Sequence, residues 1–322
     1  MMQEKRKEIT KPHSVITARM TLTAKEQDLL SLLIMKVKDS ADSQKFKDGI
    51  FDPLSPENLE SINTIFKFEV KELANILGTT VNTLKKQNRS SKTGALEPCA
   101  LEKACQAIRN QDIRIRSEQG FVGRRLVSDA AFDFDTGILT LETTRTMAGI
   151  MLDYGLKNDN FGKTDMRLLF SLNGAFEKRI LELISRFKNE RDFKITLGEF
   201  CEILNVFPEN YSSMANFRKN VIESPIARIV KHSNGMWITQ PKHPKGFHLK
   251  RGAKMNDIIT FKMKYVAPEL PAKPRPKAVT DMESILISQP DSVFAAMLPG
   301  YLKLLEENGL EILDEIENRI TS

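Results

Sequence analysis

Residues 211–232 read Tyr211-Ser-Ser-Met-Ala-Asn-Phe-Arg-Lys-Asn-Val-Ile-Glu-Ser-Pro-Ile-Ala-Arg-Ile-Val-Lys-His232, and their pattern is the most informative in the chain about its fold. At about 100° per residue, the apolar residues of segment 212–223 fall in one sector and the polar residues lie opposite. The polar side holds Ser212, Asn216, Lys219 and Glu223. Ser224-Pro225 then predicts an N-cap with proline at the first position of a restarted helix. The segment therefore predicts an amphipathic helix that buries one face and leaves the other open.

A basic segment follows this helix. Strands are predicted at 236–239 and 257–265, and Lys, Gly and Pro are frequent between them. Within 13 residues the chain places seven basic or histidine side chains and no acid: Lys242, His243, Lys245, His248, Lys250, Arg251 and Lys254. A helix followed by such a hairpin is typical of a winged helix. A solvated helix face and an ordinary basic loop are the alternatives for these two features.

The same order of elements occurs twice. In the second half, a long helix over 165–187 precedes a strand at 193–196 and a helix from 197 to 204. In the first half, helices over 21–38, 70–77 and 97–109 accompany strands near 64–70, 113–116, 124–134 and 138–142. Residues 79–95 are expected to be a mobile basic loop. The sequence thus predicts an α+β fold of two tandem winged-helix domains (helix-turn-helix motifs with β-hairpin wings) and a C-terminal helical tail.

These elements suggest five parts. They are a flexible basic N-terminus (1–20), a first winged helix (21–150), a second winged helix (155–266), a proline-rich linker (267–279) and an acidic helical tail (280–322). Residues 155–266 hold 20 Lys and Arg against 11 Asp and Glu, a net charge of +9 within a chain of +6. A focused positive field attracts polyanions and releases counterions when it docks on phosphate. The second winged helix is therefore expected to be the main DNA-binding part.

Cellular location follows from simple exclusions. The chain has no 18-residue apolar run, and its charged start is not followed by an apolar stretch. Its three cysteines form no CxxC pair. We expect a cytoplasmic protein with no membrane partner.

Enzymatic motifs are missing from the sequence. It holds no His-x-His pair, no GxxxxGK[ST] loop and no Gly-x-Ser-x-Gly turn. His243 and His248 flank a turn without further metal ligands, so neither a metal nor a cofactor is expected. We expect a non-enzymatic protein. A nicking or strand-transfer enzyme that uses Tyr211 or Tyr265 is the less favoured alternative.

Candidate DNA contacts occur in both halves. In the second winged helix they are Ser212, Ser213, Asn216, Arg218, Lys219, Lys242, Lys245, Lys250, Arg251 and Lys254. Asn and Lys can reach base edges, and helix N-terminal serines suit phosphate. In the first winged helix they are Lys103, Arg109, Arg114 and Arg116. These four could instead be solvated charges or line a dimer interface.

The chain resembles the Rep initiators of theta-replicating, iteron-bearing plasmids over about residues 12–266. The resemblance rests on Phe68-Glu-Val-Lys-Glu-Leu-Ala-Asn-Ile-Leu-Gly78, on Ile195-Thr-Leu-Gly-Glu-Phe200 and above all on Phe217-Arg-Lys-Asn-Val-Ile-Glu-Ser-Pro-Ile-Ala-Arg-Ile229. The family's usual Ser-x-Tyr-Ser-x-Arg-Leu-Tyr-like run is replaced here by Ser171-Leu-Asn-Gly-Ala-Phe-Glu-Lys-Arg-Ile180, in which Gly174 weakens a helix and suggests a bend.

The resemblance implies a tandem winged-helix initiator. Its second domain would bind direct repeats through the major groove, with base reading at Ser213, Asn216, Arg218 and Lys219. Its first domain would contact the DNA backbone in monomers and form the interface in dimers. Origin opening, recruitment of the host initiator and replicative helicase, and repression of its own gene at an inverted repeat are also implied. A winged-helix transcription regulator without a replication role is the alternative.

The acidic tail has two interpretations. It could dock a host replication protein, or it could fold back on the basic second winged helix and compete with DNA.

Overall fold

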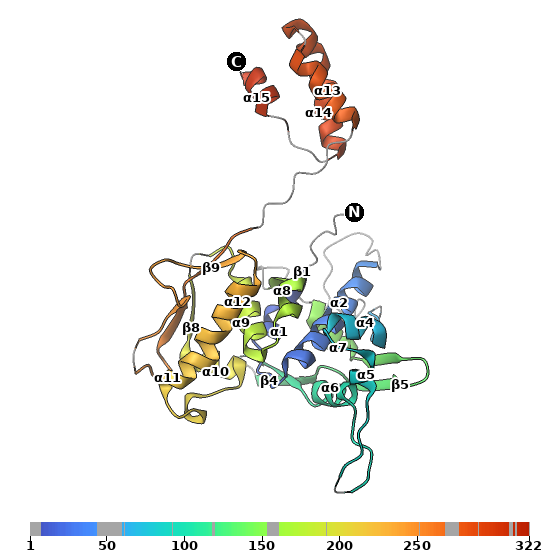
Figure 1. The fold of residues 1–322 in the computed structure, drawn as a ribbon, viewed down its shortest axis with the longest axis vertical. Coiled ribbons are helices and arrows are strands. Elements are labelled where there is room, and N and C mark those ends of the chain that lie inside the picture. The colour runs from blue at the N-terminus through green and yellow to red at the C-terminus, as the bar shows by residue number, and fades with distance from the viewer. Residues whose placement is uncertain are drawn as a thin grey trace. The chain divides into compact units, whose positions relative to one another are not determined.

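The computed structural model describes residues 8–43, 60, 62–91, 93–117, 120–152, 161–190, 192–250, 252–267, 277–288, 290–308, 312 and 314–321. The chain forms two compact units, Met1–Val266 and Ala267–Ser322. Figure 1 shows the elements of both. The first unit contains both winged helices, as the sequence predicted.

The first winged helix is built on the long helix α2 (Ala24–Ser43). Its other helices are α4 (Val70–Ile76), α5 (Val81–Lys85), α6 (Ala100–Arg109) and α7 (Arg145–Leu152). Its strands are β2 (Ile65–Glu69), β3 (Asp112–Ser117), β4 (Gly120–Arg125), β5 (Asp129–Asp133) and β6 (Ile138–Glu142). The sheet order is β2-β6-β5, with β3 and β4 as a separate antiparallel pair. Alternation in β2 buries Phe66 and Phe68 in the first core, where β2 packs on α2.

The second winged helix begins with β7 (Phe161–Asp165), α8 (Met166–Ser171) and α9 (Ala175–Arg186). It continues with β8 (Phe193–Thr196), α10 (Leu197–Leu204), α11 (Met214–Phe217), a π-helical segment η2 (Arg218–Glu223) and α12 (Ser224–His232). Its wing strands are β9 (Trp237–Thr239), β10 (Phe247–His248), β11 (Ile258–Phe261) and β12 (Met263–Tyr265). They form the sheets β10-β11-β8 and β12-β9. A second apolar core lies among these elements.

The N-terminus differs from the prediction of a flexible tail over 1–20. Residues Glu8–Pro12 form strand β1, which pairs antiparallel with β7, and His13–Ile16 form helix α1. Ile9 and Ile16 enter the second core, whereas Val15 enters the first. The prediction is wrong for residues 8–20 because a partner strand far along the chain orders a polar segment that shows no local pattern.

The helix predicted over 165–187 is two helices, α8 and α9. They are separated at Leu172–Gly174, and the Glu177 carboxylate accepts a hydrogen bond from the Gly174 N–H at 3.0 Å. A side chain at position 174 would meet that carboxylate, since a Cβ there would lie 2.5 Å from Oε1 of Glu177. The bend suggested by Gly174 is therefore a complete break, which the hydrogen bond from the Gly174 N–H to Glu177 fixes.

Two smaller expectations are also corrected. The predicted mobile loop over 79–95 contains helix α5 and an antiparallel bridge between Arg89 and Leu96. Ser224 is not an N-cap, because its backbone is helical and its N–H bonds Lys219, five residues back. This wider π turn passes directly into Pro225, which has no N–H to donate. Residues 214–232 consequently form one continuous helical run.

The C-terminal unit contains α13 (Lys277–Ser288), α14 (Asp291–Asn308) and α15 (Asp314–Thr321). It has its own small core, in which the Tyr301 hydroxyl donates a hydrogen bond to Glu283 at 2.8 Å. Most of the predicted linker, residues 268–276, lies outside the described residues. None of the helices that the structure describes has the length and apolarity of a membrane crossing.

Candidate nucleic-acid interface

The helical run of the second winged helix presents one polar face. Phe217, Val221 and Ile222 are fully buried, as the helical phase predicted. The opposite side exposes Ser212, Ser213, Asn216 and Lys219. The open side is therefore polar and carries an ammonium group, as contact with DNA edges and phosphates requires.

Hydrogen bonds organise the start of this run. The Ser213 hydroxyl caps the helix by accepting the Asn216 N–H at 3.2 Å, and the Asn216 side-chain amide donates to the Ser212 hydroxyl at 2.5 Å. Tyr211 packs edge-on against Phe217, with ring centroids 5.4 Å apart. The three polar groups are thus held together at a helix N-terminus, where free backbone N–H groups favour anions.

The wing packs directly on the helix. The Arg218 guanidinium is half-buried and lies 5.7 Å from the centroid of the Phe247 ring in β10. Lys245, in the turn before β10, forms an ion pair with Glu223 at 2.8 Å. Gly246 has a φ of +75°, and a Cβ there would lie 2.7 Å from Ile226. The wing can therefore approach the helix closely only with glycine at this position.

A single acid organises the rest of the wing. Asp257 accepts hydrogen bonds from the Lys250 ammonium at 2.6 Å and from the Lys254 N–H at 2.5 Å. The Lys250 hydrogen bond, with the Lys254 N–H second, lowers the pKa of Asp257. Lys242 and the Lys254 side chain are exposed and make no ion pair among the described residues. Arg251 lies outside the described residues.

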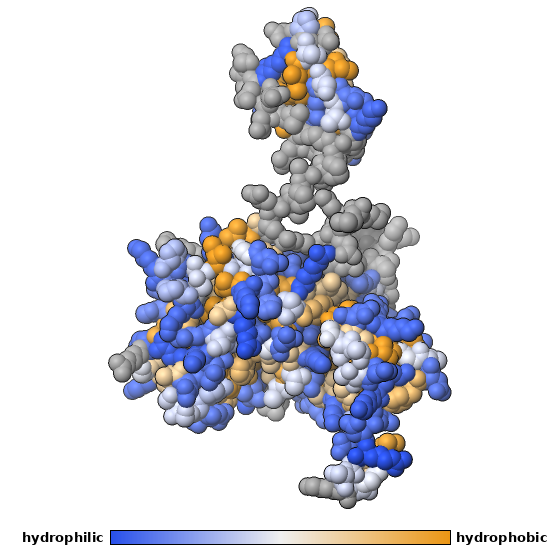
Figure 2. Space-filling view, viewed as in Figure 1, coloured by the Kyte–Doolittle hydropathy of each residue, from blue (hydrophilic) through white to orange (hydrophobic). Residues whose placement is uncertain are grey.

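The candidates of the first winged helix form a separate group. Lys103 and Arg109 are exposed on α6. Arg114 and Arg116 belong to β3, but their side chains lie outside the described residues. Residues 86–91 and 93–99 belong to a segment that projects from between α5 and α6 (Figure 1) and is largely hydrophilic (Figure 2).

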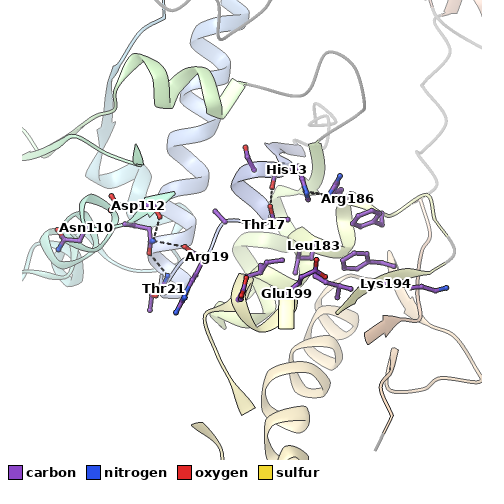
Figure 3. A pocket seen from close by; sticks show the side chains of 18 residues that line it. His13, Thr17, Arg19, Thr21, Asn110, Asp112, Leu183, Arg186, Lys194 and Glu199 are labelled. Carbon is purple, nitrogen blue, oxygen red and sulfur yellow. Dashed lines mark hydrogen bonds between the residues drawn. The ribbon is translucent and has the colours of Figure 1, made fainter. Parts of the chain in front are cut away.

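A cleft of about 980 Å³ lies at the junction of the two winged helices. Figure 3 shows that its walls come from the segment His13–Thr21, the corner Asn110–Asp112 and the region around α9, β8 and α10. Its rim mixes cations such as Arg19 and Lys194 with the acids Glu199 and Glu202. This mixed charge distinguishes the cleft from the wing segment 242–254, which contains no acid.

The comparison with known families matches both halves of the chain. The model described as Initiator Replication protein, WH1, matches residues 8–185, and the model described as Initiator Rep protein, WH2, matches residues 196–262. The chain belongs to the replication initiator family. Both models end before the C-terminal unit, so α13 to α15 lie beyond the part that defines the family. The first model also starts at β1, which agrees with an ordered N-terminal strand.

A solved structure supports the fold of this initiator. The crystal structure of the Pi initiator protein in complex with iteron DNA is 16% identical, with a TM-score of 0.55. The match covers 83% of this chain and 100% of the Pi chain. No curated protein matches the initiator by sequence.

Sequence reasoning missed the contacts that join the wing to the helix. Glu223 appeared only as an exposed polar residue, but it holds Lys245 against the helical run. Phe247 appeared only as part of a predicted loop, but it packs beneath Arg218. Asp257, the first acid after the basic run, marked the end of the wing turn in the sequence.

Proposed function

We propose that this initiator binds directly repeated origin DNA, or iterons, through the polar face of α11 and η2 and the basic wing. The observation that carries the proposal is that Asn216 and Lys219 lie in the same domain as the basic wing segment 242–254, which contains no acid. This domain matches the family's second winged helix. An amide on an exposed helix face can pair with a base edge, and the ammonium groups can neutralise phosphates. The Pi protein, of the same fold, was crystallised with iteron DNA.

The assignment of residues divides the interface by chemistry. Asn216, with Ser212 and Ser213, is proposed to read bases and the first phosphate at the helix N-terminus. Lys219, Lys242 and Lys254 are proposed to contact phosphates. Three further cations already contact other residues of the domain: Arg218 packs on Phe247, Lys245 pairs with Glu223, and Lys250 pairs with Asp257. We propose that these cations fix the shape of the wing and also contribute to its positive electrostatic potential. Arg251 is retained as a phosphate candidate from its sequence position.

The first winged helix is proposed to add backbone contacts through Lys103, Arg109, Arg114 and Arg116, or to form a self-association surface. Binding of repeats is proposed to open the origin in the cytoplasm and to recruit the host initiator and helicase. An inverted repeat at its own promoter would allow the same protein to repress its gene.

A tyrosine-dependent nicking reaction is less well supported. Tyr211 is half-buried against Phe217, and burial raises the pKa of its phenol. A raised pKa opposes formation of a nucleophilic phenolate. We therefore propose a binding protein without a covalent step.

Replication in trans tests the proposal. A plasmid that carries the repeat region, but no initiator gene, is transformed into cells that supply either this protein or its Asn216→Ala variant. Maintenance of the plasmid only with the unaltered protein is expected. Maintenance without any supplied initiator, or loss in both cases despite normal protein levels, would refute the assignment.

A further inference from the structure

Five charged side chains are buried at the junction of the two winged helices. They are Lys11, Asp28, Lys178, Arg179 and Glu182, and none is more than 4% exposed. Lys11 comes from β1, Asp28 from α2 of the first winged helix, and the other three from α9 of the second.

Ion pairs connect these charges across the junction. Lys178 reaches from α9 to Asp28 on α2 at 2.7 Å. Lys11 contacts Ser31 on α2 at 2.8 Å and forms an ion pair with Glu182 on α9. Lys11 is therefore shared by both winged helices, although it belongs to neither recognition surface.

The segment Glu8–Thr21, here called the N-terminal strap, is also held by backbone contacts. Arg179 donates hydrogen bonds to the carbonyls of Ile16 and Ala18 at 2.7 and 2.8 Å. At its end, Thr21 donates its N–H to Gln111 of the first winged helix and accepts a bond from Asn205 of the second. Figure 3 shows Arg19 and Thr21 beside the Asn110–Asp112 corner.

Buried ion pairs of this kind seldom stabilise a protein more than apolar packing would, because desolvation offsets their attraction. Their distances and hydrogen-bond directions nevertheless allow few alternative geometries. Two domains packed through leucines could shift relative to each other, whereas Lys11 keeps its contacts only if Ser31 and Glu182 both stay within hydrogen-bonding distance. The network is thus better suited to fixing an arrangement than to adding stability.

We propose that Lys11 is a positioning residue, which holds the two winged helices at one fixed separation so that both contact a repeat with a set spacing. This inference rests on the proposed DNA-binding function. If the two winged helices are held rigidly, both can bind only when the DNA segments that they contact keep one spacing and one helical phase. Five inserted base pairs turn one segment by about half a helical turn.

The first test uses DNA with such an insertion between the segments that the two winged helices protect. For the unaltered protein, the insertion should weaken binding about 100-fold, the loss expected when one of two linked contacts cannot be engaged. For Lys11→Met, the uninterrupted site should bind more weakly and the insertion should cost less than about 10-fold, because the second contact is already poorly positioned. Lys11→Arg should restore the spacing dependence.

A matched control lies on the same strand. Glu8→Gln removes the ion pair with Lys188 at the exposed end of β1. Among the described residues, no hydrogen bond or ion pair joins the Glu8 side chain to the first winged helix. It should leave the spacing dependence unchanged. If Lys11→Met fails to fold, Ser31→Ala removes the hydrogen bond from Lys11 to α2, together with the bond that Ser31 donates to the Gln27 carbonyl within α2. It should give a smaller change of the same kind.

The second test needs no DNA, and therefore separates this inference from the proposed function. Nitroxide labels at Gln106→Cys on α6 and Ala227→Cys on α12 report the distance between the two winged helices, and the native Cys99, Cys105 and Cys201 are buried. The unaltered background should give one narrow distance distribution. Lys11→Met should broaden or split it.

The outcomes separate the two ideas. A narrow distribution in both backgrounds overturns the positioning role of Lys11, even if repeats are bound. A broadened distribution in the variant supports that role, even if no repeat is bound. Equal spacing penalties in the unaltered protein and Lys11→Met also overturn it.

Discussion

Replacement of Lys219 by alanine gives the sharpest quantitative prediction for the DNA interface. Lys219 is exposed on η2 and makes no ion pair among the described residues, so its ammonium group is available to one phosphate. Loss of one phosphate contact should lower the slope of log K against log salt concentration by about 0.9. If the variant and the unaltered protein bind equally at 1 M salt, this change of slope gives the variant about fivefold lower affinity at 0.15 M salt.

The assay is fluorescence anisotropy with a repeat duplex and a scrambled duplex over a salt series. Both duplexes should lose affinity by the same factor, because phosphate contacts carry no sequence information. Lys231→Ala is the matched control: this exposed lysine lies on the same helical run, about 18 Å further along. An unchanged slope in Lys219→Ala, or equal slopes in the two variants, would refute the placement of phosphate at this face.

Three further predictions concern the DNA interface and the junction of the two winged helices. Asn216→Ala should weaken binding to the repeat but not to the scrambled duplex, as measured by competition; equal losses on both would contradict base reading. Glu223→Gln should raise affinity for both duplexes, because it removes a negative charge and frees Lys245; unchanged affinity would show that this pair lies away from DNA. Burial, partly offset by Lys178, raises the pKa of Asp28 to about 7. Because the folded protein then binds this proton more tightly than the unfolded chain, the free energy of unfolding should fall by about 2 kcal/mol between pH 5 and pH 7. Urea unfolding measures this fall, which should be absent in Asp28→Asn.

The sequence predicted those parts of the fold that depend on local periodicity. The phase of residues 212–223 was correct because burial of Phe217, Val221 and Ile222 dominates the packing of that helix. Alternation likewise predicted β2, and Gly137 correctly marked the turn before β6. Apolar pattern and turn residues thus carry enough information to place most elements.

The parts that depend on distant partners could not be predicted in this way. Strand β1 reads Glu8-Ile-Thr-Lys-Pro12, which has no strand signal of its own, and its order comes from β7 and from the contacts of Lys11. The apolar periodicity of α8 continues into α9, so Gly174 suggested only a bend, and the hydrogen bond to Glu177 was needed to show a complete break. Of the candidate site, the polar helix face was predictable, whereas the pairing of wing cations with Glu223 and Asp257 required the structure.

Hydroxyl-radical footprinting on the DNA that flanks the gene shows whether the protein binds direct repeats through α11 and η2. Purified full-length protein should protect a series of short segments that recur in the same orientation, and protection should disappear with a combined Asn216→Ala and Lys219→Ala variant. Uniform protection that follows no repeat, or a footprint that survives in the double variant, would contradict binding of direct repeats through α11 and η2.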